Sequence, residues 1–167
     1  MRLLRASDAG ALAGAYRANR DHLAPWEPQR DEDFFTPACQ AARIEASLAA
    51  TAAGTEVPWV LTSEDGIVGT LSLTGIVRGP FLSAHVGYWI DARLQGRGVC
   101  SVALHTASNH ARADLGLHRL QASVLPHNPA SRAVLARADF TLIGTAPSYL
   151  RIAGTWQDHL LYQRVLE

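Results

Sequence analysis

The chain has 167 residues, of which 48% are hydrophobic, and its 15 basic and 15 acidic side chains balance. This length suits one domain with one sizeable core, and we expect residues 1–167 to form it. The charge balance argues against a nucleic-acid-binding face, and no apolar run reaches the ~18 residues of a membrane span. Because the first residues lack a signal peptide's apolar core, we expect a cytoplasmic protein.

Metal and Schiff-base chemistry are not indicated. The two cysteines, Cys39 and Cys100, lie in dissimilar contexts, which favours free thiols over a disulfide, and the seven histidines form no metal-ligand spacing. Every basic residue is arginine, so no lysine is present to form an imine. We therefore expect no metal site.

The first elements form a strand and two helices. A short strand is expected over Arg2–Arg5, then a helix with Ser7 as its N-cap that runs to about Arg20. The segment His22–Pro28 cannot be regular helix, since two prolines bracket Trp26, which either packs in the core or lines a cleft. A second helix is expected over residues 37–53, with proline in its first turn.

The middle and end of the chain alternate strands with two more helices. Strands are expected over Val57–Thr62, Ile67–Ile76, Ser83–Ile90, Arg119–Leu125 and Trp156–Leu166, with extended segments at Phe140–Gly144 and Ser148–Ile152. Helices are expected from Val99 to about Gly116 and over Ala130–Arg137. The first of these shows an apolar side formed by Val99, Val102, Ala103, Thr106, Ala107 and Ala111. This order predicts a mixed α/β layer with helices packed on a sheet.

The turn Gln95–Cys100 joins a strand to a helix and contains Gly96 and Gly98. Such a turn presents free backbone N–H groups and the positive end of a helix dipole, which is typical of a phosphate site. A Walker A loop needs a lysine, and a dinucleotide fingerprint needs three glycines at a different spacing. Taken alone, the turn is equally compatible with an acyl-CoA site and with an ordinary tight connection.

Five motifs in chain order make the sequence resemble one family. They are Asn19-Arg20-x-His22-Leu23-x-Pro25-Trp26-Glu27-Pro28, Val77-Arg78-Gly79-x-Phe81, Gln95-x-x-Gly98-x-Cys100, Pro126-His127-Asn128-x-x-Ser131 and Trp156-Gln157-Asp158-His159. Each is weak by itself, but together they resemble the GNAT superfamily of N-acetyltransferases. Within it they resemble the RimJ/RimL type, which is ribosomal-protein-alanine N-acetyltransferase-like, and most of all its RimJ branch. The resemblance implies a mostly antiparallel twisted sheet, splayed between its fourth and fifth strands, with helices on both faces.

The resemblance also implies an acetyl-CoA-dependent enzyme that acetylates the α-amine of a protein N-terminus by direct attack. Backbone N–H groups of the turn would hold the diphosphate, with charge from Arg97 or Arg93, and the pantetheine arm would pair with the strand around Tyr88. The residues that the resemblance assigns to acetyl-CoA are Tyr88, Trp89, Ile90, Gln95, Gly96, Arg97, Gly98, Val99, Cys100, Asn128 and Ser131.

Proton transfer requires a donor for the CoA thiolate and an acceptor for the amine proton. Many relatives use a tyrosine seven residues after the asparagine, where this chain has Leu135, so the resemblance moves the donor role to Ser131. For the acceptor role we expect His85, on the fourth strand, because histidine titrates near neutrality. Its alternative is a structural histidine bonded across strands, and Ser131 could equally cap a helix.

Cys100 replaces the small residue that the family prefers, and its place at a helix N-terminus predicts a lowered thiol pKa. A covalent acetyl-cysteine route is conceivable, but no base is placed to activate the thiol. We therefore favour the interpretation that Cys100 is a small residue that the turn tolerates. For the amine substrate that accepts the acetyl group, we expect contacts from Trp26, Glu27 and Tyr149, with Glu27 binding its ammonium form. His127 and His159 are expected to be structural hydrogen-bonding residues.

Two other functions stay open. The same chemistry could serve a small amine, such as an antibiotic, an amino acid or an aminoacyl nucleotide, because fold does not determine substrate. A closed aromatic pocket would favour that reading, and an open groove would favour a peptide. The chain could also be a non-catalytic acyl-CoA-binding module. We expect a monomer or a homodimer, with neither nucleic acid nor membrane as a partner.

Overall fold

The computed structural model describes all residues 1–167 and contains one seven-stranded sheet, in the order β1-β2-β3-β4-β5-β7-β6. All neighbouring strands are antiparallel except β4 and β5, which are parallel. The strands are β1 (Arg2–Leu3), β2 (Glu56–Ser63), β3 (Gly66–Val77), β4 (Ser83–Ile90), β5 (Arg119–Val124), β6 (Thr141–Ile152) and β7 (Thr155–Val165). The predicted fold class is therefore confirmed.

Five α-helices and three short 3-10 turns accompany the sheet. The helices are α1 (Ala9–Ala18), α2 (Arg20–Leu23), α3 (Pro37–Ala52), α4 (Val99–Ala113) and α5 (Pro129–Arg137). The 3-10 turns span Ala6–Asp8, Glu32–Phe35 and Ala92–Leu94. None of the helices has the length and apolar character needed to cross a bilayer.

Several boundaries differ from those predicted, and the first strand ends at Leu3 instead of Arg5. Ser7 lies inside a 3-10 turn, and α1 begins two residues later, with Asp8 at its N-cap. His22 and Leu23 belong to α2, because Pro25 disrupts only the residues after that helix. β6 is one strand instead of two segments, with an irregular register between Ala146 and Leu150.

The buried side of α4 also differs from the predicted one. Val102 is 67% exposed, and Thr106 is exposed and donates its hydroxyl proton to the Val102 carbonyl. The stripe that meets the sheet is instead rotated around the helix. It is made of Cys100, Ala103, Leu104, Ala107, Ser108 and Ala111. Ala103, Ala107 and Ala111 are buried as predicted, so the prediction is only partly wrong. It included Val102 and Thr106 and left out Cys100, Leu104 and Ser108.

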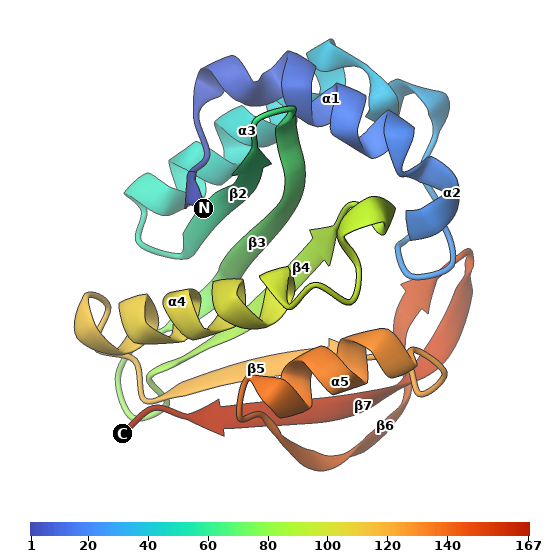
Figure 1. Cartoon of the computed structure of the whole chain (residues 1–167). Helices are drawn as coiled ribbons and strands as arrows, with labels where there is room; N and C mark the ends of the chain where they lie inside the picture. The colour runs from blue at the N-terminus through green and yellow to red at the C-terminus, as the bar shows by residue number, and fades with distance from the viewer.

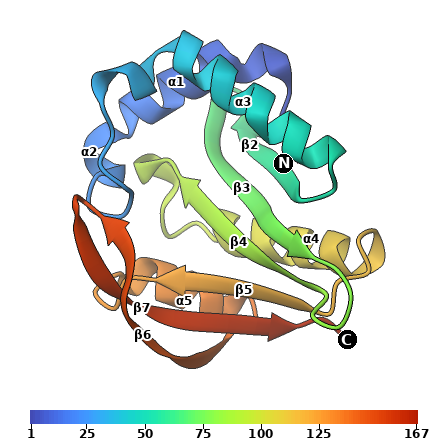
Figure 2. The same cartoon turned by 180° about the vertical axis from the view of Figure 1, so that it is seen from behind.

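Helices cover both faces of the sheet (Figures 1 and 2). α4 and α5 pack on one face, over a core that contains Leu71, Leu104 and Leu120. On the other face, α1 and α3 enclose a smaller core in which the Tyr16 and Trp89 rings lie 4.9 Å apart. Trp89 thus points away from the α4 side, as strand alternation requires.

The sheet opens between β4 and β5. Only Ser83, Ala84 and His85 of β4 pair with β5, so the backbone of Val86–Ile90 has no partner on that side. Figure 1 shows the two strands diverging toward the end of the molecule where α2 and its following loop lie. The predicted splay is confirmed, and it leaves strand-edge N–H and C=O groups free within the fold.

Candidate active site

The main cleft has a volume of about 460 Å³ and lies where β4 and β5 diverge, between the turn after β4 and the start of α5. Most residues that the sequence assigned to acetyl-CoA line it. These are Tyr88, Trp89, Ile90, Gln95, Gly96, Gly98, Val99, Cys100, Asn128 and Ser131. Arg97 is exposed and does not belong to the wall.

The turn before α4 has the geometry of an anion site. Gly96 and Gly98 have φ values of 73° and 78°, a left-handed conformation that favours glycine, and a Cβ at either glycine would meet no atom within 4 Å. Gly98 is the N-cap of α4, so the first N–H groups of this helix have no intrahelical acceptor and face the cleft. Together with the helix dipole they could hold the diphosphate of CoA.

A buried carboxylate connects this turn to α1. Asp91 accepts hydrogen bonds from the Arg93 backbone at 2.8 Å, from the Arg93 guanidinium at 3.0 Å and from the Asn19 amide at 3.2 Å. Asn19 in turn accepts from the Ala92 backbone at 3.0 Å. The Arg93 contacts hold the pKa of Asp91 well below its usual range. Arg93 is therefore paired with Asp91, and the sequence motif gave no hint of this role.

Two hydroxyl groups meet inside the cleft. The Tyr88 phenol and the Ser131 hydroxyl lie 2.9 Å apart, and burial raises the pKa of Tyr88, so the phenol stays protonated. Asn128 Oδ1 accepts from the Ser131 N–H at 3.0 Å and so caps α5. Leu135, at the family's tyrosine position, is buried in the core. Only the backbone of Tyr88 had been assigned a role from the sequence.

The predicted lowering of the Cys100 pKa is wrong. The side chain turns into the core and is 7% exposed, and this burial raises its pKa to about 11. Desolvation of the thiolate thus outweighs the helix dipole. A thiol in this state is a poor nucleophile, so the acetyl-cysteine route has no support.

A second cavity, of about 180 Å³, lies beside the main cleft at the same strand opening; we call it the strand cavity. It shares four wall residues with the main cleft, namely Trp26, Tyr88, Asn128 and Ser131. Its remaining walls come from β4, β5, β6 and β7, including Gly87, Ser123, Leu150 and His159. The two hydroxyl groups of Tyr88 and Ser131 therefore stand between the two spaces.

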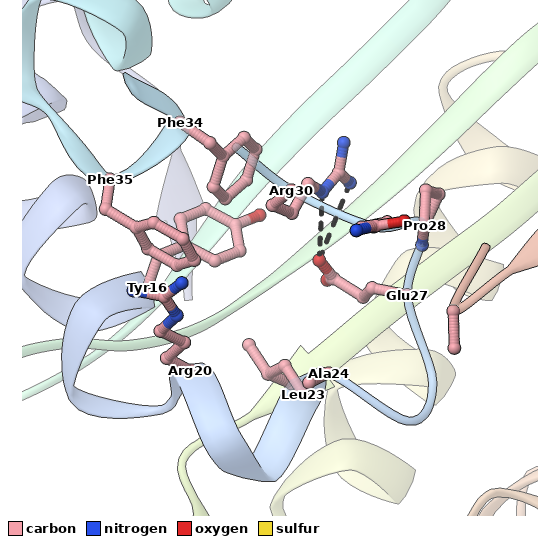
Figure 3. A pocket seen from close by; sticks show the side chains of 11 residues that line it. Tyr16, Arg20, Leu23, Ala24, Glu27, Pro28, Arg30, Phe34 and Phe35 are labelled. Atoms are coloured by element: carbon pink, nitrogen blue, oxygen red, sulfur yellow. Dashed lines mark hydrogen bonds and ion pairs between the residues drawn. The ribbon is translucent and has the colours of Figure 1, made fainter. Parts of the chain in front are cut away.

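A third space, the aromatic cavity, has a volume of about 400 Å³ and adjoins the main cleft through Leu23 and Glu27 (Figure 3). Tyr16, Phe34 and Phe35 form its aromatic side, and Glu27 pairs with Arg30 at 3.5 Å. Burial raises the pKa of Glu27, and Arg30 opposes this shift. Because Glu27 borders two spaces, its carboxylate could meet an incoming ammonium group.

The remaining predicted residues are dispersed. His85 is exposed, pairs with Gln121 of β5 and lines none of the three cavities. Tyr149 is 37% exposed and also lies outside these walls, although its ring is 5.8 Å from that of His159. Trp26 borders two cavities and has the His127 ring 5.6 Å away.

Cys39 and Cys100 are free thiols, and no group of three His, Cys, Asp or Glu side chains could hold a metal ion.

Comparison with known proteins agrees with this geometry. The profile of the acetyltransferase (GNAT) domain matches residues 1–141. The [ribosomal protein uS5]-alanine N-acetyltransferase of Escherichia coli K12 is 36% identical over 163 residues, which are 96% of this chain and 84% of that enzyme.

Two solved structures are similar over nearly the whole chain. The ribosomal-protein-S5-alanine acetyltransferase from Vibrio fischeri has a TM-score of 0.95 and 36% identity, and the match covers 99% of this chain and 92% of that one. Mycobacterium smegmatis RimJ in complex with CoA-disulfide has a TM-score of 0.93 and 33% identity, covering 98% and 80%.

Proposed function

The chain belongs to the GNAT acetyltransferase family and is an acetyl-CoA-dependent N-acetyltransferase, and from this premise we propose that its acceptor is the α-amine of a protein N-terminus. The observation that carries the proposal is the 36% identity, over 96% of the chain, to an enzyme named for acetylating an alanine of ribosomal protein uS5. A ribosomal protein is accordingly the acceptor class that we propose.

In the proposed reaction, acetyl-CoA occupies the main cleft, with its diphosphate at the N–H groups of Gly98–Cys100 and its pantetheine arm along the unpaired edge of β4. The acceptor amine reaches the thioester carbon from the strand cavity, past Trp26. Glu27, which follows Trp26 in the chain and lines the main cleft, attracts the ammonium group from the cleft side. The amine nitrogen attacks the carbonyl carbon, the C–S bond breaks, and the Ser131 hydroxyl gives a proton to the departing sulfur.

Tyr88 assists this proton transfer in our proposal. Its phenol lies 2.9 Å from the Ser131 oxygen. When the phenol donates to that oxygen, the proton of Ser131 is free to point at the sulfur. The pair thereby takes the place of the tyrosine that Leu135 replaces.

A small-molecule amine is the second candidate, and the aromatic cavity is the observation that favours it. The cavity is large enough for a drug-sized group and adjoins the cleft at Glu27. Release of free thiol from acetyl-CoA, measured with short peptides starting in Ala, Ser, Thr or Met and with aminoglycosides and amino-acid amides, separates the two. We expect turnover on peptides, highest with Ala. Turnover on small amines alone would replace the proposed acceptor, and no turnover on any amine would indicate a binding module.

A further inference from the structure

His85, which the sequence favoured as the acceptor of the amine proton, lines none of the three cavities. We propose that His159 is this general base and that the strand cavity is the site where the acceptor nitrogen is deprotonated. His159 lies on β7, is 2% exposed and lines the strand cavity together with Tyr88 and Ser131. It therefore borders the space that opens onto the hydroxyl pair.

The hydrogen bond of the ring determines which nitrogen can accept a proton. His159 Nδ1 lies 3.0 Å from the Gln157 carbonyl oxygen. A carbonyl can only accept, so Nδ1 carries a proton, and in the neutral ring the lone pair is on Nε2. No side chain or backbone group of the protein is hydrogen-bonded to Nε2. A buried imidazole beside a cavity, with one ring nitrogen anchored and the other not bonded to the protein, is suited to general-base catalysis.

Few other ionisable groups face this ring. From β4 there is Tyr88, and from β6 there is Tyr149, whose ring centre lies 5.8 Å away. On β7 the neighbouring Asp158 accepts the Ser148 N–H at 2.8 Å. His127, before α5, lies beside Trp26, while the β5 wall of residues 122–125 has no titratable side chain. The imidazole is thus the basic group of this cavity.

The protons balance with two groups. The acceptor arrives as an ammonium ion and loses two protons as the C–N bond forms. His159 Nε2 takes the first and releases it to solvent. The second goes to the Ser131 oxygen. There it replaces the proton that Ser131 gives to the sulfur as the C–S bond breaks. No oxidant, metal or further reactant is needed. This inference rests on the proposed function in one respect, because it requires the acceptor to be an α-amine.

The test compares His159→Asn with wild type on the best peptide of the acceptor panel. The asparagine amide can keep the hydrogen bond to the Gln157 carbonyl, but it lacks an equivalent of Nε2. We expect kcat/KM to fall about 100-fold or more at pH 7, with unchanged CoA affinity. Above the α-amine pKa of about 8 the acceptor is already neutral, so the loss should shrink to less than about tenfold near pH 9. His118→Asn, an exposed histidine outside the cavities, is the matched control and should behave as wild type.

A second variant guards against simple misfolding. His159→Ala should regain turnover when imidazole is added to the assay, because imidazole can supply the missing base. A His159→Asn enzyme with wild-type kcat/KM at pH 7, or one whose loss is the same at every pH, would overturn the inference. The same pH-selective loss in His85→Asn would also overturn it. A wild-type enzyme that acetylates no peptide would instead contradict the proposed acceptor, so the two failures are distinguishable.

Discussion

At the scale of single residues, the active-site proposal depends on the contact between Tyr88 and Ser131. Because Leu135 is buried where relatives carry a tyrosine, the thiolate needs another proton source. We expect Ser131→Ala to lower kcat about 100-fold without changing CoA affinity, since the hydroxyl acts only as the C–S bond breaks. Tyr88→Phe should lower kcat less than Ser131→Ala does. Added to Ser131→Ala, it should cause no further loss, because Tyr88 acts through Ser131. Steady-state kinetics with titrated CoA measures both, and unchanged turnover in Ser131→Ala would remove this residue from the mechanism.

Sequence reasoning located most of the residues that line the main cleft, but it could not foresee chemistry that depends on a side chain's surroundings. The turn glycines follow from spacing alone, because local backbone geometry decides their conformation. Asn128 was assigned to acetyl-CoA, and its N-cap role in α5 was not predicted. Cys100 shows the opposite case: its position predicts a lowered pKa, but only the fold reveals that its side chain is desolvated. Sequence reasoning assigned the base role to His85 and a structural role to His159. Spacing does not show that His159 lines the strand cavity, because the cavity walls come from distant strands.

At the scale of elements, the turn that joins β4 to α4 is the proposed diphosphate site, and Gly98 tests it. We expect Gly98→Glu to weaken CoA binding about 100-fold or more, because a carboxylate would face the diphosphate. Gly54→Glu is the matched control, since Gly54 also has a positive φ (73°) and also lacks neighbours within 4 Å, but lies outside the cleft. Equilibrium CoA binding by calorimetry measures both. Equal losses in the two variants would indicate backbone strain alone, contrary to this assignment.

The Asp91 carboxylate that anchors this turn should make stability depend on pH. Its pKa is lowered in the folded protein, so its contribution is complete above the unfolded pKa of about 3.9 and is lost as pH falls toward the folded pKa. We expect Asp91→Asn to lower the free energy of unfolding at pH 7 by about 1–3 kcal/mol and to flatten its decline below about pH 4. Urea denaturation at several pH values measures this.

Glu32→Gln, which breaks the exposed ion pair with Arg20, is the control for Asp91 and should leave stability close to wild type. An Asp91→Asn protein with the wild-type acid dependence would show that another carboxyl dominates it. Arg93 is 73% exposed, so we attribute most of the expected effect to the hydrogen bonds of the buried carboxylate and not to screened charge attraction.

Element boundaries were predictable where turn chemistry or alternation was strong, and less so where small residues pack. The strand Ser83–Ile90 and the helix that starts at Pro37 match the prediction, because alternation and a first-turn proline are local signals. The buried stripe of α4 was predicted only in part, because Ser108 is buried although it is polar and Val102 is exposed although it is apolar. The packing of small residues against a sheet depends on the partner strands, which spacing does not identify.

At the scale of the whole molecule, the fold consists of two half-sheets held together at one end. β1–β4 and β5–β7 share only the pairs made by Ser83, Ala84 and His85, and beyond them the strands separate. The family resemblance carried by the five motifs predicted this splay. The shared wall between the main cleft and the strand cavity was not predictable, because it needs Tyr88 and Ser131 to meet across the opening.

The most direct measurement is the location of the acetyl group on one acceptor. A peptide with N-terminal alanine and an internal lysine would be incubated with acetyl-CoA and sequenced by mass spectrometry, beside the same peptide with its α-amine blocked. The account predicts one acetyl group on the α-nitrogen of the free peptide, and no product from the blocked one. Acetylation of the lysine in both peptides, or no transfer to either while a small amine is acetylated, would contradict it.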